Sequence, residues 1–367
     1  MKSLECFTRR FLDIVLWLLC LVPLPPISKL RWLLVSLAIR FCWIIYLVHL
    51  LKVGINFTSE SVNSVGNVVG TALFMGNSVL GFLLLLESVL KHGTHSQLQD
   101  LRIASELQLQ RLGMFGRRRQ SGYLLPLIGV QFTCDIVRLL VNHGGDISPV
   151  FTICLPLMWI FRFRYAQLVQ YVIDLNQRSV QLRRSLLCLA SGNDLWQPYG
   201  VHECHQLQTL RSTYERIFEC YEMFSDCYGW GILGLHLLSS FQFVTNSYWM
   251  IMGLYNGRNL RSLIFNGATG VEFGIPIATL FWHGDSGAEN GRQIGCLISK
   301  LVKPKGSKRY NDLVSEFSLQ TLHQRFVVTA KDFFSLNLHL LSSMFAAVVT
   351  YLVILIQFMF AERNSKR

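Results

Sequence analysis

Seven long apolar runs divide this chain, and their lengths restrict its fold more than any other feature of the sequence. A helix that crosses the hydrocarbon core of a bilayer needs about 20 mostly apolar residues. Runs of this kind occur at Trp32 to Lys52, Gly66 to Leu90, Tyr123 to Val141, Val150 to Tyr171, Trp230 to Tyr255, Ser262 to Trp282 and Phe333 to Phe360. Because 51% of all residues are hydrophobic and only 15% are charged, the sequence predicts an all-α integral membrane protein with seven spans.

A shorter apolar run, Phe11 to Val22, precedes the first span. It is too short to cross a bilayer and follows two arginines, as the apolar part of a signal peptide does. It lacks a small-residue cleavage site, however, and continues directly into the sequence PLPP. We therefore expect residues 1–31 to form a cytoplasmic segment whose short helix packs on the bundle or lies at the membrane surface.

The basic residues indicate how the chain is oriented. The formal net charge is +12, yet Lys and Arg form no compact basic domain, so no nucleic-acid partner is predicted. With the N-terminus inside, cytoplasmic segments hold roughly two dozen Lys and Arg and outer segments about five. This bias predicts a cytoplasmic N-terminus and an extracellular tail at 361–367. Asn56, in a sequon that ends at Thr58, then lies in an outer loop that can carry a glycan.

Two of the cytoplasmic connections are long and carry apolar residues at helical spacing. The first, Val172 to Asp226, predicts helical extensions of the fourth and fifth spans below the membrane. The second, 283–332, predicts a cytoplasmic loop with anchor helices. The expected organisation is thus 32–282 for spans one to six with their extensions, then 283–332, then the last span at 333–360.

Polar residues recur along one face of the last span. Ser343, Thr350 and Gln357 are seven residues apart, which is about two helical turns. In hydrocarbon, an amide without a hydrogen-bond partner costs on the order of 1 kcal/mol or more. The spacing alone favours a role of this stripe in close helix packing within one chain. The alternative is that the stripe lines a water-filled pathway between copies of the chain.

The stretch TYLVILIQF, Thr350 to Phe358, resembles the TYhhhhhQF signature (h, hydrophobic) that closes the last helix of insect gustatory receptors. Thr350, Tyr351, Gln357 and Phe358 all match. The preceding region is also similar to the family at Leu319, Leu322, His323, Phe326, Thr329, Ala330, Phe333 and Phe334. Two positions depart from the family pattern, since Lys331 stands where Gly is common and Asn337 where Asp is common.

The resemblance implies a tetrameric, ligand-gated, non-selective cation channel whose last helix lines the pore and passes permeating cations. Gln357 and Phe358 would form the extracellular gate, with Ile354 one turn deeper and with Thr350 and Tyr351 bracing the helix. Such a receptor would work as a homotetramer, or as a heterotetramer with other gustatory receptors. It would depolarise taste neurons from the plasma membrane of their dendrites, in contact with membrane lipid.

The family also implies that a small-molecule tastant enters from outside into a pocket among the second to sixth spans. The residues that could line its outer part are Asp135, Arg138, Trp159, Phe243, Asn246, Tyr248, Trp249, Asn266 and Glu272. Asp135 and Arg138 can instead pair within one helical turn, and the aromatic residues can instead serve packing or the interfacial belt. Arg162 and Arg164, near the inner end of the fourth span, are expected to reach the phosphate headgroups.

The class of stimulus rests on one position. Sugar receptors of the family usually carry Glu directly after the TY pair, and here that residue is Leu352. The chain therefore resembles the larger non-sugar group, whose commonest stimuli are bitter or aversive compounds.

Other classes of protein find less support. The HECH sequence at His202 to His205 fits no common zinc spacing, and no hydrolase elbow, P-loop or HExxH is found, so we predict no enzyme, cofactor or metal site. A G-protein-coupled receptor has the same number of spans but needs its N-terminus outside, and its acidic-Arg-Tyr and NPxxY motifs are missing. A membrane transporter is a weaker alternative.

Overall fold

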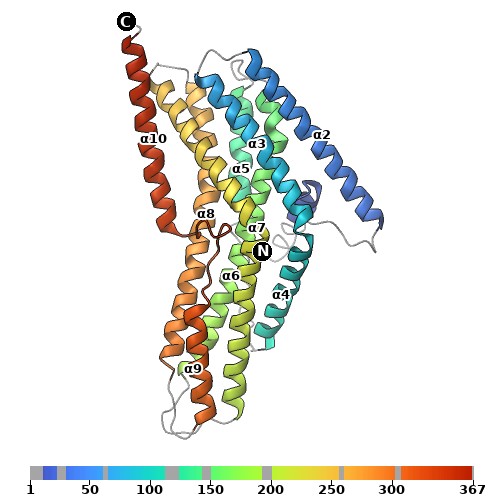
Figure 1. The fold of residues 1–367 in the computed structure, drawn as a ribbon, viewed down its shortest axis with the longest axis vertical. Helices are drawn as coiled ribbons and strands as arrows, with labels where there is room; N and C mark the ends of the chain where they lie inside the picture. The colour runs from blue at the N-terminus through green and yellow to red at the C-terminus, as the bar shows by residue number, and fades with distance from the viewer. Residues whose placement is uncertain are drawn as a thin grey trace.

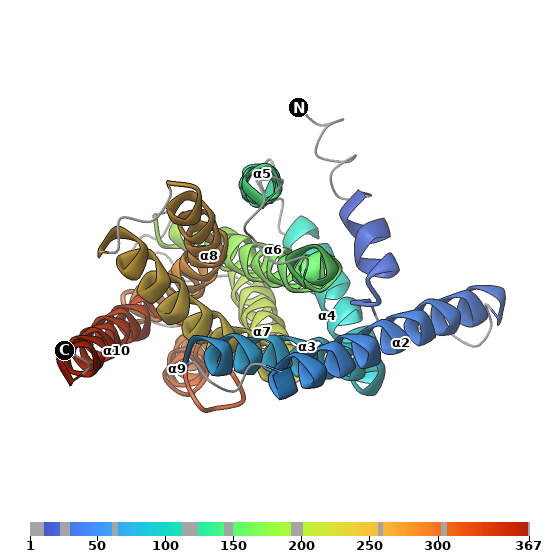
Figure 2. The same cartoon turned by 90° about the horizontal axis from the view of Figure 1, so that it is seen from above.

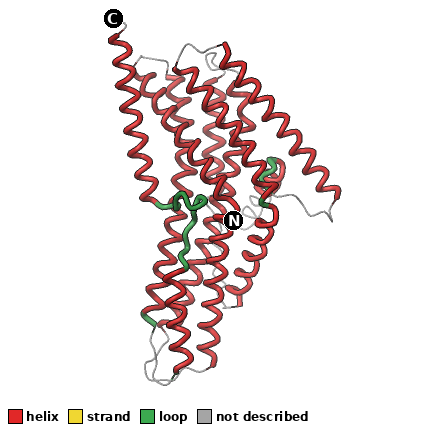
Figure 3. The backbone as a smooth tube through the Cα atoms, viewed as in Figure 1, coloured by secondary structure: helices red, strands yellow, loops and turns green. Residues whose placement is uncertain are grey.

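The computed structural model describes residues 11–22, 30–60, 65–111, 124–142, 150–191, 201–255, 260–301 and 307–365. The labelled helices are α2 (Leu30–Glu60), α3 (Val65–Leu90), α4 (His92–Arg111), α5 (Leu124–Asn142), α6 (Val150–Ser191), α7 (Val201–Tyr255), α8 (Leu260–Ser299), α9 (Lys308–His323) and α10 (Leu338–Ser365). Figure 3 shows helix almost throughout, and the described residues contain no strand beyond one isolated bridge, Thr329 with Ser335. The predicted all-α class is confirmed.

Three helices, α6, α7 and α8, run the length of the molecule (Figure 1). At 1.5 Å per residue, the 40 residues of α8 extend about 60 Å and the 55 residues of α7 about 80 Å. The hydrocarbon core of a bilayer is only about 30 Å thick. Each of these helices is therefore much longer than a single crossing requires, and the periodic stretches at 172–191 and 201–226 belong to α6 and α7.

The remaining helices divide between the two halves. In Figure 1, α2, α3, α5 and α10 occupy the upper half, whereas α4 and α9 lie beside the lower parts of the three long helices. Together with the upper parts of α6, α7 and α8, the helices α2, α3, α5 and α10 correspond to the apolar runs of the sequence. By length and composition alone, four described segments could cross a membrane: Leu30–Asn56, Gly70–Leu90, Leu263–Ser299 and Leu338–Phe358.

The core lies where α6, α7 and α8 meet, with α8 packed most extensively on α6. Seen from above, α6 is surrounded by α5, α7, α8 and α4, while α2 and α10 lie at the outside (Figure 2). The N-terminal helix at 11–18 contributes Leu12 and Leu16 to this core, and both side chains are buried. This segment packs on the bundle, which was one of its two expected positions.

The last helix begins at Leu338 and not at Phe333 as predicted. The residues before Leu338 take another conformation, because the backbone N–H of Leu336 donates to the Val328 carbonyl at 2.9 Å and Ser335 pairs with Thr329 in the isolated bridge. Lys331 and Asp332, with φ angles of 48° and 59°, turn the chain just before this stretch. Asn337 then caps α10, because its Oδ1 accepts a hydrogen bond from the backbone N–H of Leu340 at 2.7 Å. The segment between α9 and α10 also passes very close to α8, where a Cβ on Gly284 would lie 2.8 Å from the carbonyl oxygen of Leu336.

One further expectation changes with the helix bounds. The loop predicted after Lys52 does not begin there, because α2 continues to Glu60. Asn56 therefore lies exposed on the last turns of a helix rather than in a loop.

Candidate functional site

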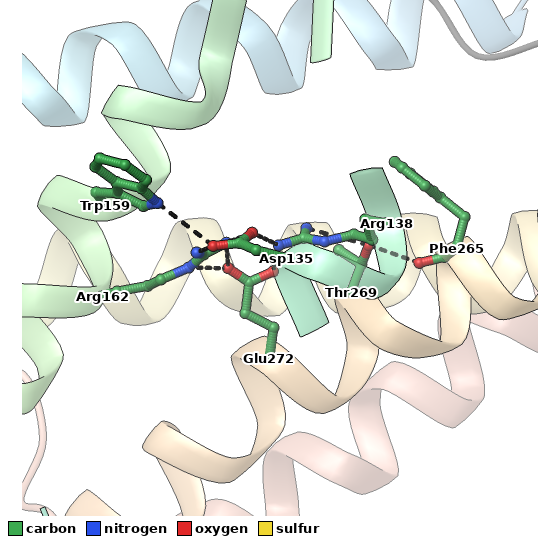
Figure 4. A network of polar contacts seen from close by, with 7 residues as sticks. All are labelled: Asp135, Arg138, Trp159, Arg162, Phe265, Thr269 and Glu272. Carbon is green, nitrogen blue, oxygen red and sulfur yellow. Dashed lines mark hydrogen bonds and ion pairs between the residues drawn. The ribbon is translucent and has the colours of Figure 1, made fainter. Parts of the chain in front are cut away.

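Two acidic and two basic side chains meet between α5, α6 and α8 (Figure 4). Asp135 and Arg138 come from α5, Arg162 from α6, and Glu272 from α8. Each of the four is at least 90% buried, and Glu272 is only 1% exposed. We call these four residues the charge cluster, and its formal charge is zero.

The contacts form a closed set in which each arginine touches both carboxylates. Arg138 donates to Asp135 at 2.8 Å and pairs with Glu272. Arg162 donates to Asp135 at 2.6 Å and also pairs with Glu272. At the edges, Trp159 Nε1 donates to Asp135 Oδ2 at 3.4 Å, and Arg138 reaches the Thr269 hydroxyl at 3.5 Å.

The cluster links α5, α6 and α8 through buried charges. An isolated charge in a low-dielectric interior is very costly, so two buried carboxylates need both guanidinium groups. Pro276 follows one turn after Glu272 on α8 and has no N–H to offer to the Glu272 carbonyl, so the backbone is weakened just beside the cluster. The arrangement can hold α5, α6 and α8 in one register, and any change in their register must disturb it.

Part of the cluster was predicted and part was not. The Asp135–Arg138 pair within one helical turn is confirmed, and Trp159 and Glu272 lie with it as possible pocket residues. The expectation that Arg162 extends to the headgroups is wrong, because its side chain is buried between Asp135 and Glu272. Charge balance in the sequence could have indicated the position of Arg162, since two carboxylates in apolar runs require two cations.

Arg164 also differs from its prediction. Its side chain is 1% exposed and pairs with Glu87 of α3, while it donates to Gln167 at 2.8 Å. Glu87 accepts in addition from the backbone N–H of Gly231 on α7 at 3.0 Å. Glu87 and Arg164 thus tie α3, α6 and α7 together, a connection that spacing along one helix cannot reveal.

A buried histidine lies beside this second pair. His95 of α4 is hydrogen-bonded through Nδ1 to the Tyr228 hydroxyl at 2.8 Å. Burial, together with the positive charges of Arg164 and Arg102, lowers the pKa of His95 from 6.5 to about 4. The imidazole is therefore neutral at pH 7. Since the folded pKa is depressed, stability contributed by neutral His95 is lost as the pH falls from 6.5 toward 4.

The other predicted pocket residues take separate positions. Phe243 of α7 packs edge-on against Phe345 of α10, with ring centroids 5.6 Å apart. Asn246 donates to the backbone oxygen of Gln242 one turn earlier, at 2.7 Å. Tyr248 and Trp249 pack against each other at 5.5 Å. None of these contacts leads to the charge cluster, and Asn266, on α8, lies six residues before Glu272.

The predicted pore residues lie on the least buried helix of the bundle. Only 6% of the residues in the Leu338–Phe358 window of α10 are buried, against 39% for the corresponding window of α3. Tyr351, Ile354, Gln357 and Phe358 are all exposed. The Thr350 hydroxyl donates to the Ala346 carbonyl on its own helix at 2.9 Å.

A carboxylate just below the upper half fixes the segment that leads into α10. Asp226 of α7 accepts from Lys91, between α3 and α4, at 2.9 Å, and it also pairs with Lys331. These two ammonium groups hold the pKa of Asp226 below its usual value. The lowered pKa means that the bridge stabilises the folded chain above the ordinary carboxyl pKa and is lost as acid protonates Asp226. We call Lys91, Asp226 and Lys331 the Asp226 bridge.

Replacing Asp226 with Asn should loosen the start of α10 without unfolding the bundle, because Asp226 is half exposed. Hydrogen exchange at residues 329–335 should accelerate about tenfold, which corresponds to local opening made easier by ~1.4 kcal/mol. Asp312→Asn, an exposed acidic position on α9, is the matched control and should leave this exchange unchanged. Unaltered exchange in Asp226→Asn would show that the bridge does not hold the segment.

Known proteins with similar sequences and structures identify the family. The family model described as 7tm Chemosensory receptor matches residues 10–362. Gustatory receptor 23a of Drosophila melanogaster is 45% identical over 252 residues, which make up 66% of this chain and 67% of that protein. These matches confirm the resemblance of the C-terminal signature, and they agree with the prediction of a receptor rather than an enzyme.

The solved structure of the insect olfactory receptor OR5 from Machilis hrabei superposes with a TM-score of 0.68 at 13% identity. The match covers 96% of this chain and 99% of that one, and the same receptor in complex with eugenol matches equally well. At this identity the likeness concerns the fold, which is that of a seven-helix membrane receptor. Taken with the sequence matches, it follows that this chain belongs to the 7tm chemosensory receptor family, among the insect gustatory receptors.

Proposed function

We propose that this chain is one subunit of a tetrameric, ligand-gated, non-selective cation channel that depolarises a taste neuron. In this proposal, α10 of each subunit lines a central pore and the outer halves of α3, α5, α6, α7 and α8 sense the stimulus. The subunits are either four copies of this chain or copies mixed with other gustatory receptors. The site of action is the dendritic plasma membrane.

The placement of the polar stripe on α10 carries the proposal. The side of α10 that faces α7 and α8 includes Leu341 and Val348, which line a cavity there. Ser343, Thr350 and Gln357 are displaced from them by two residues, which is about 200° around a helix. The stripe therefore points away from its own chain, which argues against packing within one subunit and supports an axis shared by several copies.

The gate follows from the same geometry. Gln357 and Phe358 are exposed near the C-terminal end of α10, and Ile354 lies one turn before them. Around a fourfold axis, the Gln357 amides can bond one another in a closed pore and offer carbonyl oxygens to cations in an open one. Rings of Phe358 or Ile354 side chains would exclude water from a closed pore.

The orientation rests on the distribution of basic residues. With the lower half of Figure 1 in the cytoplasm, α4, α9 and the lower parts of α6, α7 and α8, which carry many of the basic residues, lie on the inner side, in keeping with the positive-inside rule. Asn56 and the C-terminal end of α10 then lie outside, and a glycan at Asn56 would project from the last turns of α2.

We propose a small organic molecule of the bitter or aversive class as the stimulus. A receptor of the same fold is known in complex with eugenol, and Leu352 departs from the pattern of the sugar receptors. The charge cluster sits among the helices proposed to sense it, and α8 carries Glu272 and also packs against α10. A stimulus that shifts α8 relative to α5 and α6 would thus act on the pore helix directly.

Whole-cell recording from cells that express this chain tests the proposal. Bitter alkaloids, amino-acid analogues and sugars would be applied while GDP-β-S in the pipette blocks G-protein signalling. We expect a bitter compound to evoke a non-selective cation current that survives the block, with this chain alone or co-expressed with receptors of the same cell. A current abolished by the block would indicate a G-protein-coupled receptor, and saturable uptake without current would indicate a transporter.

A further inference from the structure

A cavity of about 300 Å³ lies between α7, α8 and the first turns of α10. Its walls include Phe243 from α7, Gly274 and Ala278 from α8, and Leu341, Phe345 and Val348 from α10. This volume is at the lower end of the range for small-molecule sites, roughly 300–1,000 Å³. The cavity is separate from the charge cluster, which α5, α6 and α8 form.

The walls of the cavity are almost wholly apolar. Its two hydroxyl groups are already engaged: Ser239 shares a hydrogen bond with the Tyr165 hydroxyl at 2.9 Å, and Ser240 donates to the His236 carbonyl at 2.7 Å. No charged side chain is among the residues that line it. The chemistry fits a hydrocarbon moiety and offers little to a polar tastant.

The space is present because α8 carries a glycine there. A Cβ built on Gly274 would meet no atom within 4 Å, so the backbone faces open volume. Gly284, further along the same helix, is instead required for a close approach to Leu336. The missing side chain of Gly274 leaves volume that a bound molecule can fill. The missing side chain of Gly284 instead leaves space that Leu336 already occupies.

The position of the cavity determines what can reach it. Gly274 lies about 21 Å along α8 from Leu260, and Leu341 lies within the first turn of α10. The segments Leu263–Ser299 and Leu338–Phe358 are both apolar enough to cross a membrane. The cavity therefore opens at the depth of hydrocarbon, where the abundant apolar molecule is lipid.

We propose that this cavity binds the acyl chain of a bilayer lipid, wedged between the pore helix and the α7–α8 pair. The chain fills volume that an apolar site in contact with lipid does not leave to water. The bound acyl chain holds the start of α10 away from α8. It thereby sets the separation of these two helices before any movement of α10. The inference rests on the membrane placement of these helices and does not require that α10 line a pore.

Photolabelling tests the proposal on the full-length receptor reconstituted in a bilayer. The probe is a phosphatidylcholine with a diazirine in the middle of one acyl chain, and mass spectrometry locates the adducts. We expect adducts at 271–278 and 341–348 in the wild type. In Gly274→Leu the new side chain occupies the cavity, and labelling there should fall about tenfold, which corresponds to ~1.4 kcal/mol of lost affinity.

Two matched variants keep the result interpretable. Gly129→Leu makes the same change at an exposed glycine of α5, where a Cβ also meets no atom within 4 Å, and it should leave the adducts unchanged. Phe345→Ala removes a side chain that is 55% exposed and enlarges the cavity, so its labelling should equal or exceed that of the wild type.

Three outcomes would overturn the proposal. Equal labelling in the wild type and Gly274→Leu would show that no acyl chain occupies the cavity. Loss of labelling in both Gly274→Leu and Phe345→Ala would show that a displaced α10, and not the filled volume, is the cause. A cross-link from 341–348 to a second copy of the chain, without lipid adducts, would assign the space to a neighbouring subunit. The labelling experiment measures lipid adducts and needs no ion current. A failure of the channel proposal can therefore be told apart from a failure of the lipid proposal.

Discussion

Replacing Arg162 with Gln should strongly destabilise the receptor. Arg162 contacts both Asp135 and Glu272, and the variant leaves these two buried carboxylates with Arg138 alone. Removing one partner of a buried ion pair costs about 3–5 kcal/mol, because a charge is left without compensation. Thermal melting of the purified receptor and the fraction that reaches the cell surface should both fall sharply.

A compensated variant separates charge balance from lost packing. Glu272→Gln combined with Arg162→Gln restores neutrality and retains the Asp135–Arg138 pair at 2.8 Å. We expect this double variant to recover most of the lost stability, as partners in one network are not additive. Arg292→Gln removes an exposed arginine from an i,i+3 pair with Glu289 and should leave the melting temperature unchanged.

The stability of Arg162→Gln also tests whether the four side chains of the charge cluster pair with one another in the interior of the receptor. Arg162→Gln with the stability of the wild type would mean that water or lipid headgroups compensate the carboxylates, so the cluster would not be the buried set in Figure 4. Destabilisation that the double variant does not rescue would mean that Arg162 acts through packing alone. In either case the view of the cluster as a lock on the register of α5, α6 and α8 would fail.

The charge cluster illustrates what sequence can and cannot predict. Asp135 and Arg138 are three apart on one helix, and their pairing follows from helical geometry. Arg162 and Glu272 are 110 positions apart, and their pairing depends on how α6 and α8 cross, which periodicity does not encode. The prediction that arginines near the end of a span reach the phosphate headgroups was therefore wrong for Arg162 and Arg164.

The start of the last helix shows the same limit at the level of the backbone. The apolar run from Phe333 has helical composition, and α10 contains no Gly or Pro, so a single helix was the natural prediction. Lys331 adopts the left-handed conformation that Gly favours, and the Asp226 bridge holds its side chain. Asn337 caps α10 as Asp would. The backbone of this chain thus accommodates Lys331 and Asn337 at the two positions that depart from the family pattern.

What the sequence predicted well depends on length and period. Apolar runs long enough to span a bilayer became helices, and the periodic connections became the lower parts of α6, α7 and α8 and the whole of α9. The cavity beside α10 could not be predicted, because it arises where three helices diverge around Gly274. A glycine in a helix does not by itself predict a cavity, because the surface that faces it is not known from the sequence.

In the proposed channel, Gln357→Ala and Phe358→Ala should change the resting leak or the ion selectivity while leaving surface expression intact. Both residues are exposed on α10, and none of the described residues donates to or accepts from the Gln357 amide. Folding of the single chain therefore does not depend on them. In Gln357→Ala, the loss of one amide contact at the proposed gate, worth ~1 kcal/mol, should alter the ratio of cation permeabilities about fivefold.

The two variants act in different directions because the residues contribute different chemistry. Gln357→Ala removes the oxygen that a partly dehydrated cation contacts, so relative permeabilities should change more than leak. Phe358→Ala removes an apolar ring that excludes water, so leak should rise. Leu355→Ala, two residues and therefore about 200° around α10 from Gln357, is the matched control and should preserve selectivity. Wild-type leak and selectivity in both gate variants, at wild-type surface levels, would remove α10 from the pore and return its polar stripe to a packing role.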